Sequence, residues 1–279
     1  MSKRSINWRK TVLAALALAI CFSAALTHAA AERENGPVGT IPWLLTATSE
    51  QNALYEECNL GDACADSLRL ALNTDLAIVN GGDLTGNLPP GELSREDFES
   101  AIRPDLPLAV AEVSVARLRQ ILESALSHVR LTPDRQYDAE NSGHGAFPHI
   151  SGFTLAYDPG EPAGRRVVWI KYGDERLDLT DTELSFTLAA TEYMLGGGYE
   201  LPAVPGAKTT EYTLRLAMER YIRAGMDDYS RPARRITAIG MKITAYQKNT
   251  GLIFVAVACI MIALLYPTIK TVRKSVRRK

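Results

Sequence analysis

The sequence predicts an α+β domain with a mixed β-sheet and packed helices. Strand-like and helix-like segments interleave along the chain. Several strand pairs look like hairpins, joined by short turns such as Asp158-Pro159-Gly160 and Gly173-Asp174-Glu175. The 279 residues are 46% hydrophobic and 23% charged, which is ordinary for a globular protein, and no internal repeat period is present. The formal net charge is −1, whereas nucleic-acid binders carry an excess of positive charge, so we expect no nucleic-acid partner.

The N-terminal segment has the organisation of a secretory signal peptide. Four basic residues among the first ten precede an apolar stretch from Thr11 to Leu26, and small residues follow at 29–31. We predict a signal peptide over residues 1–30, with cleavage after Ala29 or Ala31. An uncleaved signal anchor is the alternative.

The C-terminal segment predicts a transmembrane helix over residues 251–269. No charge interrupts the chain from Gly251 to Tyr266, and six basic residues lie in the tail, 270–279. Basic residues beside a span mark its cytoplasmic side, so we expect the preceding domain in the periplasm or outside the cell. A buried core helix is the alternative.

The first half of the exported region contains clear local signals. Residues 31–49 are predicted to form a linker or a first strand. Asn59 is the expected cap of a helix over 60–73, followed by a strand at Leu76–Val79. Residues 88–93 are predicted as a loop, and Ser94 opens a short helix.

The second half continues the alternation. We predict a strand at Leu106–Val113, a helix capped by Ser114, and an exposed loop over 130–146. Further strands are expected at 153–157, 166–172 and 184–190. An amphipathic helix is predicted over Thr210–Arg223, and residues 238–250 form a juxtamembrane linker.

Two cysteines, Cys58 and Cys64, lie between the signal and the span. Their spacing near a helix start is poor for a disulfide, which favours two buried free thiols, although pairing is the alternative.

Five ordered motifs resemble the C-terminal domain of 5'-nucleotidases. They are 57–62 (Glu-Cys-Asn-Leu-Gly-Asp), 80–85 (Asn-Gly-Gly-Asp-Leu-Thr), 147–152 (Phe-Pro-His-Ile-Ser-Gly), the hairpin that begins at Asp158-Pro159-Gly160, and 196–199 (Gly-Gly-Gly-Tyr). The resemblance covers residues 50–237. It implies the half of those enzymes that grips the nucleoside, and it implies a final helix and an exit strand near Arg235-Ile236.

The resemblance implies ligand-binding positions but also altered ones. The candidate ligand residues are Asn80, Gly81, Gly82, Asp83, Asp105 and Tyr199. Family members stack the base between two aromatic rings; Tyr199 matches one, but Pro104 or Asp105 replaces the other. Thr85 and Leu54 stand where the family has arginines, and Gly197 stands where it usually has aspartate. We therefore expect weak binding of anionic nucleotides.

The metallophosphoesterase half of the family has no counterpart in this sequence. The motifs Asp-x-His, Gly-Asn-His and Gly-His-x-His do not occur. We predict no catalytic residue, no metal site and no cofactor, and His144 with His149 is a weak pair of ligand candidates.

Three functions compete. The first is a non-catalytic recognition module for a nucleoside-like or nucleotide-like ligand, linked to nucleotide catabolism. The second is a structural or protein-interaction module with a decayed pocket. The third is a phosphoester hydrolase acting with a separately encoded metallophosphoesterase.

Overall fold

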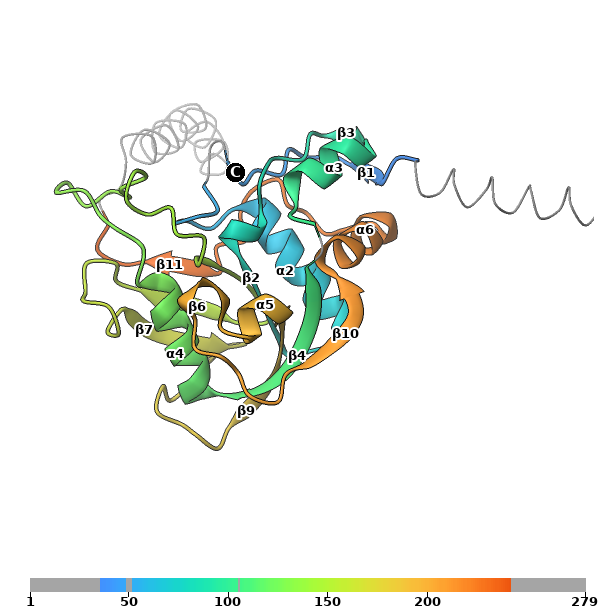
Figure 1. Cartoon of the computed structure of the whole chain (residues 1–279). Coiled ribbons are helices and arrows are strands. Elements are labelled where there is room, and N and C mark those ends of the chain that lie inside the picture. Colours follow the sequence, from blue (N-terminus) through green and yellow to red (C-terminus); the bar gives the residue numbers. More distant parts are fainter. Residues whose placement is uncertain (1–35, 49–51, 105, 242–279) are drawn as a thin grey trace, which may run out of the picture.

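A computed structural model describes residues 36–48, 52–104 and 106–241 (Figure 1). The predicted signal peptide, transmembrane helix and basic tail lie outside the described residues, as does Asp105. Within the described ranges, no helix has the length and apolar character needed to cross a membrane.

A five-stranded mixed sheet forms the centre of the domain, in the order β10-β4-β9-β2-β5. Its strands are β2 (Leu76–Asn80), β4 (Pro107–Ser114), β5 (Pro148–Ser151), β9 (Ser185–Thr191) and β10 (Lys208–Thr213). Strands β2 and β9 are parallel, and the other neighbours are antiparallel. The predicted α+β class with a mixed sheet is therefore confirmed.

The two faces of this sheet belong to two hydrophobic cores. Successive side chains of a strand point to opposite faces, so Leu76 and Ile78 join one core while Ala77 and Val79 join the other. The helices α2 (Asn59–Leu72) and α6 (Leu214–Ala224) pack in the core of Ala77. The helix α4 (Val115–Leu126) packs in the core of Leu76.

A four-stranded sheet, ordered β11-β6-β7-β8, completes the α4 side (Figure 1). Its strands are β6 (Thr154–Tyr157), β7 (Val167–Tyr172), β8 (Glu175–Arg176) and β11 (Ile236–Ala238). The predicted hairpins β6–β7 and β7–β8 are present, and the final strand β11 pairs in parallel with β6.

Four shorter elements complete the domain. Strand β1 (Gly39–Ile41) pairs with β3 (Gly91–Leu93), next to helix α3 (Arg95–Ala101). Helix α5 (Glu192–Leu195) follows β9. Val38 and Ile41 are fully buried, so the packed domain includes part of the segment predicted as a linker or first strand.

Three local predictions need correction. Residues 91–93, predicted within a loop, form β3 because β1 supplies an antiparallel partner. Residues 210–213, predicted as helical, belong to β10, and α6 begins only at Leu214 after Thr213 caps it. The cap of α2 is Cys58, whose Sγ accepts a hydrogen bond from Gly61 N at 3.3 Å.

Asn59, the predicted cap, instead joins two segments, residues 44–46 and the segment of Tyr229, to the start of α2. Its amide group donates to the carbonyls of Leu44 and Tyr229, both at 2.9 Å. Its Oδ1 accepts from Thr46 N at 2.7 Å. The thiols of Cys58 and Cys64 are free and buried, as predicted.

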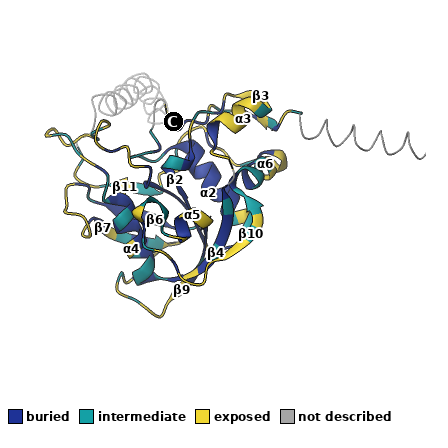
Figure 2. Cartoon of the chain, in the orientation of Figure 1, coloured by how far each residue is buried: buried dark blue, intermediate teal, exposed yellow. Residues whose placement is uncertain are grey.

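Helix α2 is the central helix of the domain. Every residue from Asn59 to Leu68 is buried, and Figure 2 shows most of the helix in dark blue. On one side, Gly61 faces the ring of His149, a fully buried residue of β5. A Cβ atom at Gly61 would lie 2.1 Å from His149 Nδ1, so only glycine fits. The other ring nitrogen, Nε2, lies 3.1 Å from Ala53 O and bonds to it.

Carboxylates at the start of α2 hold the segment that follows α6. The backbone N–H groups of Arg235 and Ile236 donate to Glu57 at 2.7 and 3.0 Å, and Ala233 N donates to Asp62 at 2.8 Å. The guanidinium of Arg235 pairs with Asp66 at 2.6 Å. Ser151 and Tyr229 donate to the same Asp66 carboxylate. These contacts fix the path of the chain into β11.

We expect Gly61→Ala to destabilise the domain by about 3 kcal/mol, because the added methyl group overlaps the His149 ring. His149→Ala removes that obstacle, so Gly61→Ala should cost about 1–3 kcal/mol less in that background. Chemical denaturation of the two single variants and the double variant measures this coupling. Gly143→Ala, whose Cβ would lie 3.9 Å from its nearest neighbour, is the control. Equal costs in both backgrounds would contradict the contact.

Arg235→Leu should lower the free energy of unfolding by about 3 kcal/mol, since it leaves the Asp66 carboxylate without its cationic partner. Hydrogen exchange at β11 amides should accelerate more than exchange at β4. The exposed Arg231→Leu is the matched control and should change neither quantity. Unchanged exchange at β11 in Arg235→Leu would show that Glu57 and Asp62 suffice to hold the segment.

Candidate functional site

The glycine turn after β2 is built by backbone contacts. The chain leaves β2 through a single 3₁₀ turn at Gly81–Asp83. Gly81 N donates to Phe147 O at 2.8 Å, and Gly82 N donates to Gly145 O at 2.9 Å. A Cβ at Gly81 would lie 1.8 Å from Ala53 O. Both glycine N–H groups are therefore occupied, and Gly81 is required by the close approach of residue 53.

Asn80 lies at the end of β2 and is almost fully buried. Its Nδ2 donates to Ala146 O at 3.0 Å, which ties the turn to the loop before β5. Its Oδ1 is buried and makes no hydrogen bond with any described residue. Buried polar atoms are normally paired, so this oxygen is an available acceptor.

Tyr199 and Asp83, 116 positions apart in the sequence, meet in the structure. The Tyr199 hydroxyl donates to Asp83 Oδ1 at 2.8 Å, and Arg103 Nη1 donates to the same hydroxyl at 3.4 Å. The Tyr199 ring lies against Gly82: a Cβ there would be 2.7 Å from the hydroxyl oxygen. Gly82 therefore makes room for the tyrosine ring.

The backbone at this tyrosine is unusual. Tyr199 and Glu200 both have left-handed dihedral angles, with φ of 55° and 59°. Non-glycine residues rarely adopt this region, and such conformations persist where the surroundings hold them. The Asp83 hydrogen bond and the Gly82 contact are two such restraints.

A cleft of about 590 Å³ opens beside Tyr199, next to α5. Its lining residues are His144, Tyr193, Gly196, Gly197, Gly198, Tyr199 and Glu200. The Tyr193 ring is half exposed and meets the Tyr199 ring edge-on, with centroids 5.2 Å apart and planes at 79°. The cleft thus presents two aromatic rings, although sequence analysis predicted one.

Burial controls the charge of Asp83. Removal from water raises the pKa of this carboxyl group to about 6, while the Tyr199 hydroxyl and the Arg103 charge lower it by smaller amounts. The same burial, together with the adjacent Asp83, raises the pKa of the Tyr199 hydroxyl. Tyr199 is therefore the hydrogen-bond donor, and Asp83 is the acceptor.

Two histidines and a glutamate gather at the rim of the cleft. The rings of His128 and His144 are stacked, with centroids 3.6 Å apart and planes at 5°. Their Nε2 atoms lie 3.9 and 3.8 Å from the carboxylate oxygens of Glu200. Sequence analysis paired His144 with His149 instead, but His149 is buried against Gly61.

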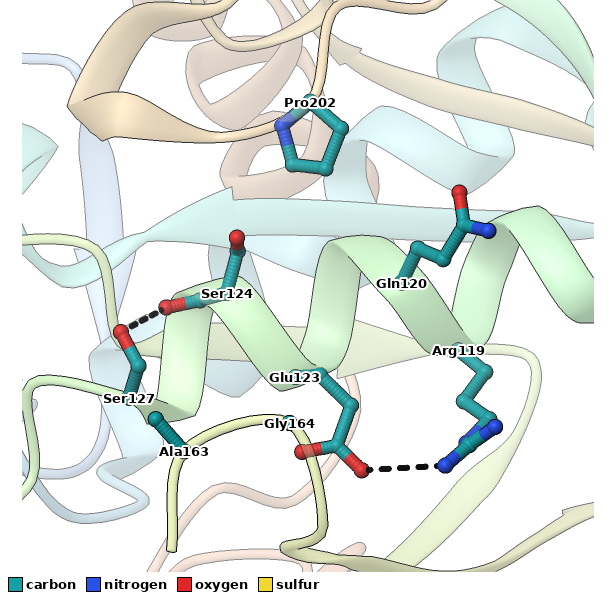
Figure 3. A pocket seen from close by; sticks show the side chains of 8 residues that line it. All are labelled: Arg119, Gln120, Glu123, Ser124, Ser127, Ala163, Gly164 and Pro202. Atoms are coloured by element: carbon teal, nitrogen blue, oxygen red, sulfur yellow. Dashed lines mark hydrogen bonds and ion pairs between the residues drawn. The ribbon is translucent and has the colours of Figure 1, made fainter.

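A second hollow, of about 540 Å³, lies between α4 and the loop at residues 163–164 (Figure 3). Its lining residues include Arg119, Glu123 and Ser127, and none of the predicted ligand residues. Glu123 accepts hydrogen bonds from Arg166 N and Val167 N at 2.8 and 3.0 Å. Its carboxylate is therefore occupied in joining α4 to β7, and the hollow is the weaker candidate.

The structure brings most predicted site residues together. Asn80, Gly81, Gly82 and Asp83 form one turn, and Tyr199 closes over it; Asp105 lies outside the described residues. Sequence analysis missed Arg103, Tyr193, His128 and Glu200. Tyr193 and Glu200 flank the glycine cluster, and that proximity was the available signal. The sequence contains no signal for His128, because this residue is far in sequence from the other residues of the cleft.

Comparison with known proteins gives a consistent result. A model of the family described as 5'-nucleotidase, C-terminal domain, matches residues 37–206. The chain is 26% identical over 149 residues to the trifunctional nucleotide phosphoesterase protein YfkN of Bacillus subtilis. It is 27% identical over 160 residues to a probable 5'-nucleotidase of Treponema pallidum. These alignments cover 51% and 54% of this chain but only 9% and 25% of the two relatives.

Solved structures share the fold. The 5'-nucleotidase precursor of Thermus thermophilus superposes with a TM-score of 0.63 at 19% identity, over 80% of this chain and 44% of that one. The NAD nucleotidase of Haemophilus influenzae superposes with a TM-score of 0.56 at 17% identity, over 85% and 46%. The chain thus corresponds to less than half of either protein.

Asp83→Asn should stabilise the domain at pH 7.5 by about 2–3 kcal/mol, the equivalent of a pKa raised from 3.8 to about 6. Folded Asp83 holds its proton more tightly than the unfolded chain does. Protonated Asp83 therefore costs the folded wild type little at low pH, but ionisation of this buried group lowers the free energy of unfolding as the pH rises from about 4 to about 6. The asparagine variant carries no titratable group at position 83 and does not lose stability in this way. Denaturation curves between pH 4 and 8 measure the difference.

Asp75→Asn is the control with the opposite sign. Hydrogen bonds from Thr187 lower the pKa of Asp75, so this carboxylate stabilises the fold as pH rises. An Asp83→Asn effect that is independent of pH would contradict the assigned environment of Asp83.

Proposed function

The chain belongs to the 5'-nucleotidase C-terminal domain family, and from that premise we propose that it is a recognition module for a nucleoside-like ligand. The proposed site is the cleft of Tyr199 and Tyr193. The proposed role is ligand binding within nucleotide catabolism, without hydrolysis by this chain alone.

The observation that carries the proposal is the fixed orientation of Tyr199. Its hydroxyl is bound by Asp83, its ring rests on Gly82, and its backbone is held in a left-handed conformation. A rigid aromatic ring at the wall of a cleft desolvates a flat base at little entropic cost. Tyr193 supplies a second apolar surface in the same cleft. Arg103 places a positive charge 3.4 Å from the Tyr199 hydroxyl.

The proposed non-catalytic role rests on sequence motifs. The 279 residues contain none of the metal-binding motifs of the family's catalytic domain. Two-metal hydrolysis needs several carboxylate and imidazole ligands converging on both ions. We therefore assign hydrolysis, in this proposal, to a metallophosphoesterase domain outside this sequence. The basic, apolar and small-residue order at residues 1–30 and the apolar segment 251–269 support export and anchoring in a membrane.

One observation favours the alternative of a structural module with a decayed pocket. Gly82 and Tyr199 fit each other so closely that the tyrosine ring also fills space in the fold. In that alternative, Tyr199 supports the turn after β2 and binds no ligand.

Adenosine should raise the melting temperature of the purified full chain. A ligand at tenfold its Kd contributes about 1.4 kcal/mol, or about 3–6 °C for a domain of this size. The shift should disappear in Tyr199→Ala and shrink in Tyr193→Ala, because each variant removes a ring from the cleft. AMP should give a smaller shift than adenosine, since ionised Asp83 disfavours a phosphate nearby.

Tyr172→Ala is the matched control, because this exposed ring lies on β7 and contacts Phe186 rather than the cleft. Thermal shifts are recorded with chelator and with added divalent metal. No shift with millimolar nucleosides, nucleotides or nucleotide sugars under either condition would favour the structural alternative. Release of phosphate from AMP by the chain alone would contradict the non-catalytic role.

A further inference from the structure

The cluster of His128, His144 and Glu200 is assembled from three separate parts of the chain. His128 follows the end of α4, His144 belongs to the long loop before β5, and Glu200 follows Tyr199. One donor atom of each side chain lies within 4.8 Å of the others. Each carboxylate oxygen of Glu200 faces a different imidazole, Oε2 towards His128 and Oε1 towards His144.

We propose that His128, His144 and Glu200 bind one divalent transition-metal ion, of the Zn²⁺ class, at the rim of the cleft. Two imidazole nitrogens and one carboxylate form a donor set that suits zinc, with bonds of about 2.0–2.2 Å. Ligand atoms around such an ion lie closer together than the donor atoms do here. The two imidazole rings are also stacked, so both rings must rotate out of the stack to direct their lone pairs at one ion. Three protein ligands also leave a fourth position for water or for an oxygen atom of a bound molecule.

The side chains have the freedom to move that metal binding requires. The Glu200 side chain is 76% exposed, so it can move towards the histidines, and the His128 and His144 side chains are 26% and 32% exposed. A neutral imidazole presents a nitrogen lone pair to a metal ion. A simple ion pair with Glu200 would instead require a protonated ring.

Glu200 shares the left-handed backbone of Tyr199. With φ of 59° it follows another left-handed residue, and this path carries the carboxylate to the two imidazoles. Strained backbone is typical of binding and catalytic sites. The metal site does not rest on nucleoside recognition, because its ligands include neither Asp83 nor a tyrosine.

Isothermal titration calorimetry of the full chain, after chelator treatment and removal of the chelator, tests the site with Zn²⁺ alone. We expect one equivalent of Zn²⁺ to bind with a micromolar or lower Kd. His128→Gln and His144→Gln should each weaken binding at least tenfold, and Glu200→Gln should also weaken it. Affinity should fall below about pH 6, because protonated imidazole is no ligand. Glu211→Gln, an exposed glutamate on β10, is the matched control.

A Cu²⁺ electron paramagnetic resonance spectrum gives a second readout. The wild type should show hyperfine coupling to two nitrogen ligands, and each histidine variant should show coupling to one. Melting temperatures in chelator establish that the variants fold. Absence of Zn²⁺ binding, or an unchanged Kd in His128→Gln/His144→Gln, would overturn the proposal. Either result leaves adenosine binding through Tyr199 intact, so the two proposals fail separately.

Discussion

The rest of this structure depends on the hydrogen bonds and the ion pair that the carboxylates of Glu57, Asp62 and Asp66 make with the segment after α6. Asp62 and Asp66 are buried in α2, which packs between a sheet and a second helix, so water cannot take the place of a lost partner there. Glu57 is partly exposed and lies two residues before this helix. Leaving such groups unpaired is costly. The segment that carries Tyr229 and Arg235 must therefore dock as α2 packs, and this docking presents β11 to β6. A segment distant from α2 in sequence thus becomes part of the surroundings of this helix.

The same helix sets the position of the candidate site through a short series of contacts. Gly61 admits the His149 ring, and that ring donates to Ala53 O. The Ala53 carbonyl also bounds the space at Gly81, which explains why the chain after β2 turns without a side chain. Beyond it, Gly82 receives Tyr199. At Gly61, Gly81 and Gly82 the backbone lies too close to a neighbouring group for any side chain to fit. The same close contacts therefore pack the core and shape the cleft.

Signals confined to a few residues allowed prediction, and partners distant in sequence did not. Ser94 and Ser114 cap their helices as predicted, because a cap depends only on the next turn. Strand β3 was missed because it exists only by pairing with β1, and the start of α6 was misplaced because 210–213 belong to the strand that pairs with β4. At the site, a family resemblance identified Tyr199 and the glycine turn. It contained nothing about His128, which reaches the cleft only through the tertiary fold.

Tyr199 and Glu200 are adjacent residues whose side chains serve different neighbours, Asp83 in one direction and the stacked histidines in the other. Both residues belong to one left-handed stretch of backbone. Under the two proposals, a single peptide bond would join the residue that contacts the ligand to a residue that holds the ion. Any effect of one occupant on the affinity of the other would then be equal in both directions, by thermodynamic linkage.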